Sequence, residues 1–354
     1  MTRAFAWIVL LLALTLGSAR AERLVIGLAI PPGVTDGGMA AAAELGLFKA
    51  EMIEPEYLVF QGAGALLPQI ATGQVQIGLP LTEPVLASYQ PGNAPLPVTF
   101  FYNANPYNGL ELAVLADGPV QTIADLKGRA VGVGALTWGT IPQTRSLLAL
   151  SGLHPGKDVD IVAVGVLGAG FNALRTGRVA ALNFNENWND MLEQQGTRLR
   201  RLPFPPAYRR MISNAYVANR TKLKASPDLY GRFGRVVAQG AVICDTDPRF
   251  CIEAFWRGHP EARPKEDDAA KTMADALAMV TKNTAKVLRD EANNERVRGA
   301  FDLGVIREYV SAMKQSGEFA SSDIPLSDVF SNALVPEFSK FDRAALVARV
   351  RAAR

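Results

Sequence analysis

Gly46-Leu47, Gly62-Ala63-Gly64 and Thr72-Gly73 are three landmarks of residues 44–83, and all three return in residues 150–188. The second set is Gly152-Leu153, Gly168-Ala169-Gly170 and Thr176-Gly177. The first two landmarks recur after 106 residues and the third after 104, which one two-residue deletion explains. Each copy reads as a helix end, a strand, a glycine turn, a helix and a strand. Such a repeat predicts two similar α/β lobes that face each other with a ligand between them.

Short apolar runs precede both copies and fit the same plan. Leu24-Val25-Ile26-Gly27 precedes the first copy, and Ala130-Val131-Gly132-Val133 precedes the second. Strands that alternate with helices predict largely parallel sheets covered on both faces. Ligands of such sheets bind outside the carboxyl ends of the strands. This rule places six loops at the site: residues 30–36, 61–64 and 80–83 of one lobe, and residues 134–140, 166–170 and 183–188 of the other.

The composition of the 354-residue chain is that of a globular protein, with 49% hydrophobic and 20% charged residues. The length suggests two domains, each large enough to build its own core. The formal net charge is +3, and about +1 would remain without Arg3 and Arg20. A charge so near neutral does not indicate nucleic acid or an anionic membrane as partner.

The first 21 residues have the pattern of a secretory signal. Arg3 gives a positive start, residues 7–16 are apolar, and Ala19-Arg20-Ala21 fits a cleavage site after Ala21. A membrane anchor is the alternative, but the run is shorter than the ~20 residues that span a bilayer. We therefore expect export to a periplasm. We expect residues 22–112 to begin the first lobe, residues 113–214 to form the second, and residues 215–354 to complete the first with C-terminal helices.

The cysteines Cys244 and Cys251 are the only two in the chain, and Asp245-Thr246-Asp247-Pro248 follows the first of them. On one continuous helix, residues seven apart lie roughly 10 Å apart, which is beyond the reach of a disulfide. A bridge therefore requires a break in the helix, which the Asp-Pro pair allows. The sequence leaves a disulfide and two free thiols as equal alternatives, and either is expected to be structural.

Several segments together resemble the type II periplasmic solute-binding proteins of ABC importers, in the branch that serves sulfonates, nitrate and thiamine pyrimidine precursors. The segments are residues 44–49, with Glu-Leu-Gly-Leu-Phe-Lys, residues 60–64, with Phe-Gln-Gly-Ala-Gly, residues 70–78, residues 123–133, residues 151–153 with 158–159, and residues 173–181. The resemblance covers roughly residues 21–260. Acidic residues that the family usually carries are replaced by Gln76 and Ala180, which weakens the choice of a subfamily.

The resemblance implies a two-lobed fold that closes on a small solute by hinge motion and then docks on a permease of the inner membrane. It implies a monomer with no cofactor and no catalytic residue. A sensory receptor for a membrane signalling partner is the alternative. An enzyme similar to the thiamine-pyrimidine synthase is a remote one, because that enzyme is intracellular and depends on histidine and cysteine-rich motifs. This chain has two histidines, His154 and His259, and neither has a metal-like partner at short spacing.

In the first lobe, the predicted ligand-binding residues are Gln61, Gly62, Thr82, Glu83 and Tyr102. Gly62, like Gly168 in the second copy, precedes a helix whose free N–H groups favour an anion, although a tight turn between strand and helix is the preferred explanation of these glycines. Gln61 lies at a strand end. Thr82 and Glu83 lie in the loop after the third strand, and Tyr102 either lines the cleft or packs at the hinge.

In the second lobe, the predicted ligand-binding residues are Trp138, Thr140, Asn183, Asn185, Glu186 and Trp188. Trp138 is expected to stack on a planar solute or to pack against the hinge, and Thr140 to bind solute or cap a helix. The other four belong to residues 183–188, the loop richest in polar and aromatic side chains. Carboxylates at Glu83 and Glu186 would favour a solute with amino or ring N–H groups, such as an aminopyrimidine, over a sulfonate or nitrate.

Overall fold

The computed structural model describes residues 21–265 and 268–353. The expected export signal, apart from Ala21, lies outside the described residues. Within the described part of the chain, no helix has both the length and the apolar character needed to cross a membrane.

The first of two sheets has the strand order β2-β1-β3-β10-β4. Its strands are β1 (Glu22–Leu28), β2 (Ile53–Val59), β3 (Ile77–Leu79), β4 (Val98–Asn103) and β10 (Ala215–Asn219). The first three are parallel to one another, and β10 runs antiparallel to both of its neighbours. The buried apolar side chains of β1 suit its place inside the sheet. β4 is last in the order but wholly buried, and isolated bridges join it to Gly299 and Phe330.

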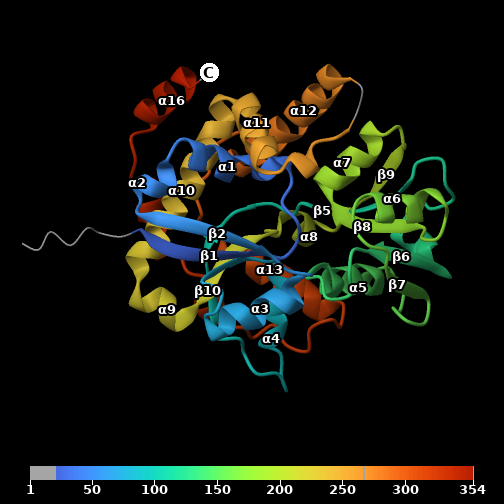
Figure 1. Ribbon diagram of the computed structural model, residues 1–354. Coiled ribbons are helices and arrows are strands. Elements are labelled where there is room, and N and C mark those ends of the chain that lie inside the picture. Colours follow the sequence, from blue (N-terminus) through green and yellow to red (C-terminus); the bar gives the residue numbers. More distant parts are fainter. Residues whose placement is uncertain (1–20, 266–267, 354) are drawn as a thin grey trace, which may run out of the picture.

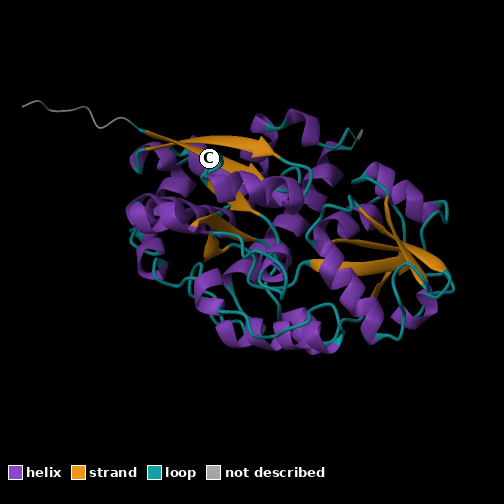
Figure 2. Ribbon diagram, turned by 90° about the horizontal axis from the view of Figure 1, so that it is seen from below, coloured by secondary structure: helices purple, strands orange, loops and turns teal. Residues whose placement is uncertain are grey.

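The second sheet has the corresponding order β7-β6-β8-β5-β9. Its strands are β5 (Leu110–Leu115), β6 (Arg129–Val133), β7 (Val159–Ala163), β8 (Ala181–Asn185) and β9 (Leu199–Leu202). Again the three strands of the repeated unit are parallel, and β5 is antiparallel to its neighbours. Figure 1 and Figure 2 show the two sheets side by side, each surrounded by helices. The predicted two-lobed α/β fold is confirmed.

Helices cover both sheets. Those of the repeated units and the connections are η1 (Val34–Asp36), α1 (Gly37–Glu44), α2 (Leu47–Ala50), α3 (Ala63–Thr72), α4 (Glu83–Ser88), η2 (Ile123–Leu126), α5 (Thr140–Leu150), α6 (Gly168–Arg175), α7 (Glu186–Gln194) and α8 (Pro206–Arg210). Those of the C-terminal part are α9 (Arg220–Ala225), α10 (Pro227–Thr246), α11 (Pro248–Gly258), η3 (Pro260–Ala262), α12 (Ala269–Leu288), α13 (Leu303–Gln315), α14 (Leu326–Val329), α15 (Val335–Phe338) and α16 (Arg343–Ala352). The single helix expected over residues 39–48 is instead α1 and α2, divided at Gly46.

The glycine landmarks mostly occupy equivalent places in the two copies. Gly73 and Gly177 both have a left-handed backbone, with φ of 77° and 73°, beside the C-termini of α3 and α6. The turn before the second helix differs. Gly62 has φ of 91°, but its counterpart with positive φ is Leu167, at 48°, and not Gly168. The alignment of Gly62 with Gly168 is therefore off by one residue, and the copies differ by more than one deletion.

The C-terminal helices complete the first lobe: α10 and α11 pack against α1, and α12 packs against α10, α11 and η1. The structure joins Cys244 and Cys251 in a disulfide, with 5.5 Å between their Cα atoms. The helix break that such a bridge requires is present: α10 ends at Thr246, and Asp247 caps α11 by accepting from the amide of Phe250. Aspartate before proline therefore both ends one helix and begins the next.

Strand β9 was not expected from the sequence, which suggested a solvated surface for Arg200 and Arg201. Instead, Arg201 lies at the edge of the second sheet and forms ion pairs with Glu111 and Asp190, at 3.1 and 3.0 Å. Arg200 donates to the carbonyl of Val120 at 3.2 Å. Two arginines can occupy this edge strand because each has a partner on a neighbouring element.

Candidate functional site

The loops at the carboxyl ends of the two parallel units meet each other. The amide of Gly64 donates to the carbonyl of Thr137 at 3.2 Å, and the Thr137 hydroxyl donates to the carbonyl of Gln61 at 2.7 Å. At another point the Asn187 amide donates to the Thr35 hydroxyl at 3.2 Å. The loops that the sequence placed at a ligand cleft are therefore in contact across the two lobes.

Gly62 is required by this contact. A Cβ atom at Gly62 would lie 2.8 Å from the carbonyl oxygen of Thr137, and the backbone at φ 91° and ψ 171° is accessible only to glycine. At Gly168, by contrast, a Cβ atom would meet nothing within 4 Å. Of the two glycine turns that the sequence treated alike, only the first takes part in the contact between the lobes.

Glu83 begins α4 and is a buried carboxyl, 1% exposed. Its Oε1 accepts from the Tyr309 hydroxyl at 3.0 Å, and that hydroxyl in turn accepts from the Gln143 amide at 3.5 Å. Burial raises the pKa of Glu83 to about 7, in spite of the opposing hydrogen bonds from the backbone and Tyr309. The three side chains come from α4, α13 and α5, so this group joins the two lobes.

Buried side-chain oxygens without a hydrogen-bond partner gather in the same loops. They include oxygens of Thr82, Glu83, Thr140, Gln143, Asn183, Glu186 and Asn187. The side-chain NH₂ group of Asn183 donates to the Thr144 hydroxyl at 2.6 Å. This hydrogen bond fixes the direction of the side-chain carbonyl oxygen, which has no partner. Buried polar groups are usually satisfied, so this concentration makes these loops the candidate site.

Glu186 is 4% exposed and forms an ion pair with Lys286; the Nζ of Lys282 lies 3.4 Å away. Lys282 also pairs with Asp190 at 2.7 Å. Since the lysines belong to α12 and the carboxylates to α7, these pairs connect the two lobes, and Figure 1 shows α12 next to α7. One oxygen of Glu186 remains without a partner.

The remaining predicted residues have structural contacts. Asn185 caps α7 by accepting from the amide of Trp188 at 3.0 Å. Trp138 packs against Phe184 and Trp188, with ring centroids 6.0 and 5.7 Å apart, although it is only half-buried. Tyr102 is 3% exposed and packs against Phe338 at 4.7 Å, so it lies in the core of the first lobe.

Asp36 was not predicted individually, but it ends η1 within the loop of residues 30–36 that was placed at the site. Its position after a strand was a usable signal. Tyr107, next to the crossover, was expected either to add an aromatic wall to the site or to pack at the hinge, and its hydroxyl accepts from the Asn283 amide at 2.8 Å.

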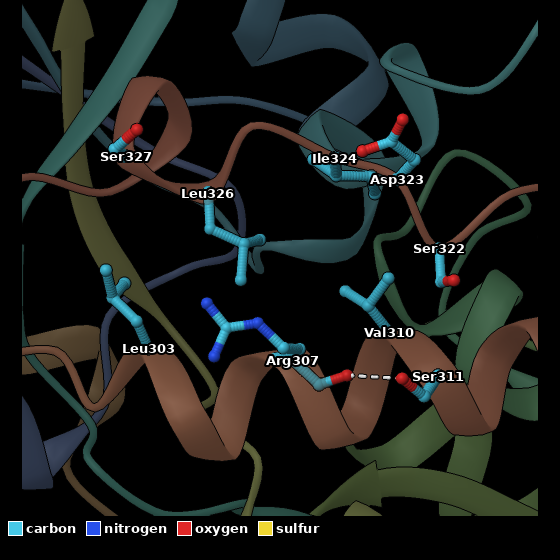
Figure 3. A pocket seen from close by; sticks show the side chains of 9 residues that line it. All are labelled: Leu303, Arg307, Val310, Ser311, Ser322, Asp323, Ile324, Leu326 and Ser327. Atoms are coloured by element: carbon cyan, nitrogen blue, oxygen red, sulfur yellow. Dashed lines mark hydrogen bonds between the residues drawn. The ribbon is translucent and has the colours of Figure 1, made fainter.

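A cavity of about 360 Å³ lies elsewhere, between α13 and residues 322–327. Figure 3 shows the exposed Arg307 side chain extending between Leu303 and Leu326. Another cavity, of about 510 Å³, is lined by Pro106, Asp290, Arg296 and neighbouring residues up to Leu303. Neither cavity is lined by any of the partnerless buried oxygens, and we do not regard either as the functional site.

The chain belongs to the NMT1/THI5-like family, whose model matches residues 36–249. No curated protein matches it. The fold is that of periplasmic binding proteins, as the sequence indicated. A solved protein from Bordetella bronchiseptica RB50 has 17% identity and a TM-score of 0.69, with coverage of 91% of this chain and 98% of that one.

Two further solved structures carry names. The alkanesulfonate-binding protein SsuA from Xanthomonas axonopodis pv. citri, bound to MOPS, has 14% identity and a TM-score of 0.64, with coverage of 88% and 99%. The nitrate-binding protein NrtA from Synechocystis PCC 6803 has 12% identity and a TM-score of 0.61, with coverage of 94% and 98%. At sequence identities this low, these similarities support the assignment of the fold alone.

Proposed function

We propose that the protein is the periplasmic solute-binding component of an ABC importer. It captures a small organic solute between its lobes and delivers it to a membrane permease, without catalysis. The observation that carries the proposal is the group of buried, partnerless oxygens contributed by both lobes, at the carboxyl ends of their parallel strands. The named neighbours, a sulfonate-binding and a nitrate-binding protein, support a solute-binding role.

The character of the cleft favours a solute that donates hydrogen bonds. The partnerless atoms of Gln143 and Asn183 are carbonyl oxygens, which only accept, and that of Glu83 is a carboxyl oxygen, which accepts when the group is ionised. The lysines of α12 near the cleft already pair with Glu186 and Asp190. A nitrogenous solute with amino or ring N–H groups therefore fits better than sulfonate or nitrate, which bring only acceptors.

The first test is native mass spectrometry of the mature protein purified from cells, followed by denaturation to identify any released solute. That solute is then titrated calorimetrically, and compaction on binding is followed by small-angle X-ray scattering. We expect one solute per chain and a smaller radius of gyration. Binding without compaction would contradict capture by closure of the lobes.

A pair of glutamine variants locates the site. Gln143→Ala removes a buried group of the cleft, whereas Gln121→Ala changes an exposed glutamine of the same lobe. Loss of one hydrogen bond to the solute is worth about 1 kcal/mol, or roughly fivefold in affinity. Equal affinities of the two variants would place the solute elsewhere.

A sensory role is the second candidate, in which the closed protein engages a membrane signalling partner instead of a permease. The same cleft serves both roles, so the distinction rests on the partner. Reconstitution of the protein with the permease and ATPase encoded beside it, followed by a solute-uptake assay, decides between them. Uptake that does not depend on the protein would reject the transport role.

A further inference from the structure

We infer that Glu83 selects the charge of the solute: its carboxyl group forms an ion pair with a cationic nitrogen of the solute, such as an ammonium or an amidinium, and releases its proton in doing so. The inference rests on the proposed function and deepens it by naming the class of solute and the residue that selects it. A solute with only neutral N–H groups would satisfy the proposed function but would leave Glu83 protonated.

Contacts from three helices hold the Glu83 side chain in place. Glu83 begins α4, its Oε1 accepts from the Tyr309 hydroxyl of α13 at 3.0 Å, and the same hydroxyl accepts from the Gln143 amide of α5 at 3.5 Å. The starts of α4 and α5 also touch, since a Cβ atom at Gly139 would lie 2.8 Å from the Cβ atom of Leu81. The carboxyl group therefore lies at the contact between the two lobes.

Further hydrogen-bond acceptors lie beside the same part of α5. Thr140, Gln143 and Thr144 share one face of this helix by their spacing, and the Thr144 hydroxyl donates to the Thr140 carbonyl at 2.8 Å. Asn183 donates to that hydroxyl at 2.6 Å. The side-chain carbonyl oxygens of Gln143 and Asn183 have no donor, and neither has Oε2 of Glu83. A group with several N–H donors, as in an ammonium or an amidinium, is suited to such surroundings.

Glu83 differs from Glu186, the other buried acid among the predicted ligand-binding residues, because it has no positive partner. In the described part of the chain, no lysine, arginine or histidine forms an ion pair with Glu83, and only burial and hydrogen bonds act on its carboxyl group. Glu186, by contrast, is paired with Lys286. A buried carboxylate without a positive partner is strongly unfavourable, so a cation at Glu83 would provide the charge that the fold itself does not.

In the absence of solute, a proton takes the place of that cation. Burial raises the pKa of Glu83 to about 7. Because Oε1 accepts from Tyr309, the proton is carried by Oε2, the oxygen without a partner. When a solute cation reaches Oε2, the O–H bond breaks and the proton leaves to solvent. One positive charge enters the site and one leaves it.

The other titratable groups on the helices around Glu83 keep their charge near neutral pH. Burial raises the pKa of Tyr309 on α13 and of Tyr208 on α8 above the ordinary value of 10. Arg145 of α5 is exposed and forms a two-pronged ion pair with Glu318, with its Nε 3.0 Å from one carboxylate oxygen. Glu83 is therefore the group of this contact whose charge can change when a solute binds near neutral pH.

The test titrates wild type and variants calorimetrically with propylammonium, benzylammonium and benzamidinium chlorides, with the neutral benzamide, and with sodium nitrate and propanesulfonate. We expect at least one cation to bind wild type, and Glu83→Gln to weaken its binding roughly tenfold or more. Glu54→Gln is the matched control, because it changes an exposed carboxylate. Glutamine at position 83 keeps the shape of the side chain and an acceptor for Tyr309, and a thermal melt checks that each variant is folded.

Proton release is a readout that a purely structural role of Glu83 would not affect. The affinity of wild type for the cation should rise by about tenfold per pH unit up to about pH 7 and stay constant above it, because below pH 7 binding must displace the proton. Titrations at about pH 6 in two buffers of different ionisation enthalpy should show about one proton released per cation bound. Glu83→Gln should show neither effect.

Other outcomes separate the inference from the proposed function. A cation that binds wild type and Glu83→Gln equally, or binding of nitrate or propanesulfonate alone, would overturn the inference and leave the proposed function standing. A solute recovered from cells without a cationic nitrogen would do the same, whereas a cationic one is titrated in place of the probes. If no probe binds and protein from cells carries no solute, both the inference and the proposed function are overturned.

Discussion

Replacing Glu83 with glutamine should make the protein more stable at neutral and alkaline pH. Glu83 is 1% exposed, and the Tyr309 hydroxyl donates to one of its oxygens. Glutamine has the same shape and can accept from Tyr309 through its own carbonyl oxygen, but it carries no charge to desolvate. The substitution therefore isolates the cost of ionising a buried carboxyl group.

The magnitude follows from the pKa, which is raised by burial from an ordinary value of 4.5 to about 7. Between these values the folded state holds a proton that the unfolded state has released, so stability falls as pH rises. The difference between these two pKa values corresponds to about 3 kcal/mol of unfolding free energy, which the wild type loses between about pH 4.5 and pH 7. Below that window Glu83 is neutral in both states, and the variant should match wild type.

The assay is urea unfolding at half-unit steps from pH 4.5 to pH 8.5, followed by tryptophan fluorescence. The difference in unfolding free energy between Glu83→Gln and wild type should grow from pH 4.5 to about pH 7 and stay constant at higher pH. Glu54→Gln, which changes an exposed carboxylate on β2, should show no such trend. Parallel profiles for wild type and Glu83→Gln would refute the assignment of a neutral buried acid.

Three further changes test other parts of the structure. Replacing Cys244 and Cys251 with serine opens a short loop and should cost about 2 kcal/mol in urea unfolding, whereas reductant should have no effect on the variant. Gly62→Ala should weaken solute affinity severalfold because its Cβ meets Thr137, and Gly168→Ala should not; equal effects would contradict the contact. Glu186→Gln should widen the open state in small-angle scattering and reduce the dependence of closure on salt, since it weakens pairing with the lysines of α12; an unchanged salt dependence would exclude that role.

Much of the fold could be predicted from the sequence because it depends on local sequence patterns. The repeated glycines mark turns and helix ends where a left-handed backbone is needed, as at Gly73 and Gly177. The one misalignment, at Gly168, arose because Leu167 adopts positive φ, which a rule based on glycine cannot anticipate. Strand β9 was missed because its two arginines are expected to be solvated unless distant partners are known: carboxylates for Arg201 and the Val120 carbonyl for Arg200.

The candidate site was predictable to the level of loops but not of side chains. Residues 30–36, 61–64 and 134–140 do lie where the lobes meet, as expected from the strand ends. Asn185, however, serves as a helix cap, and Trp138 packs on its own lobe. A loop sequence does not specify which of its polar groups the local backbone will use.

The sequence by itself determined two α/β lobes, their glycine turns and the edge of each sheet that faces the other. Only the tertiary structure decided which charges stay free, because the partners lie far away along the chain. Glu83 meets Tyr309 across 226 residues, and Glu186 meets Lys286 across 100. Burial and pairing of this kind arise only when distant segments pack.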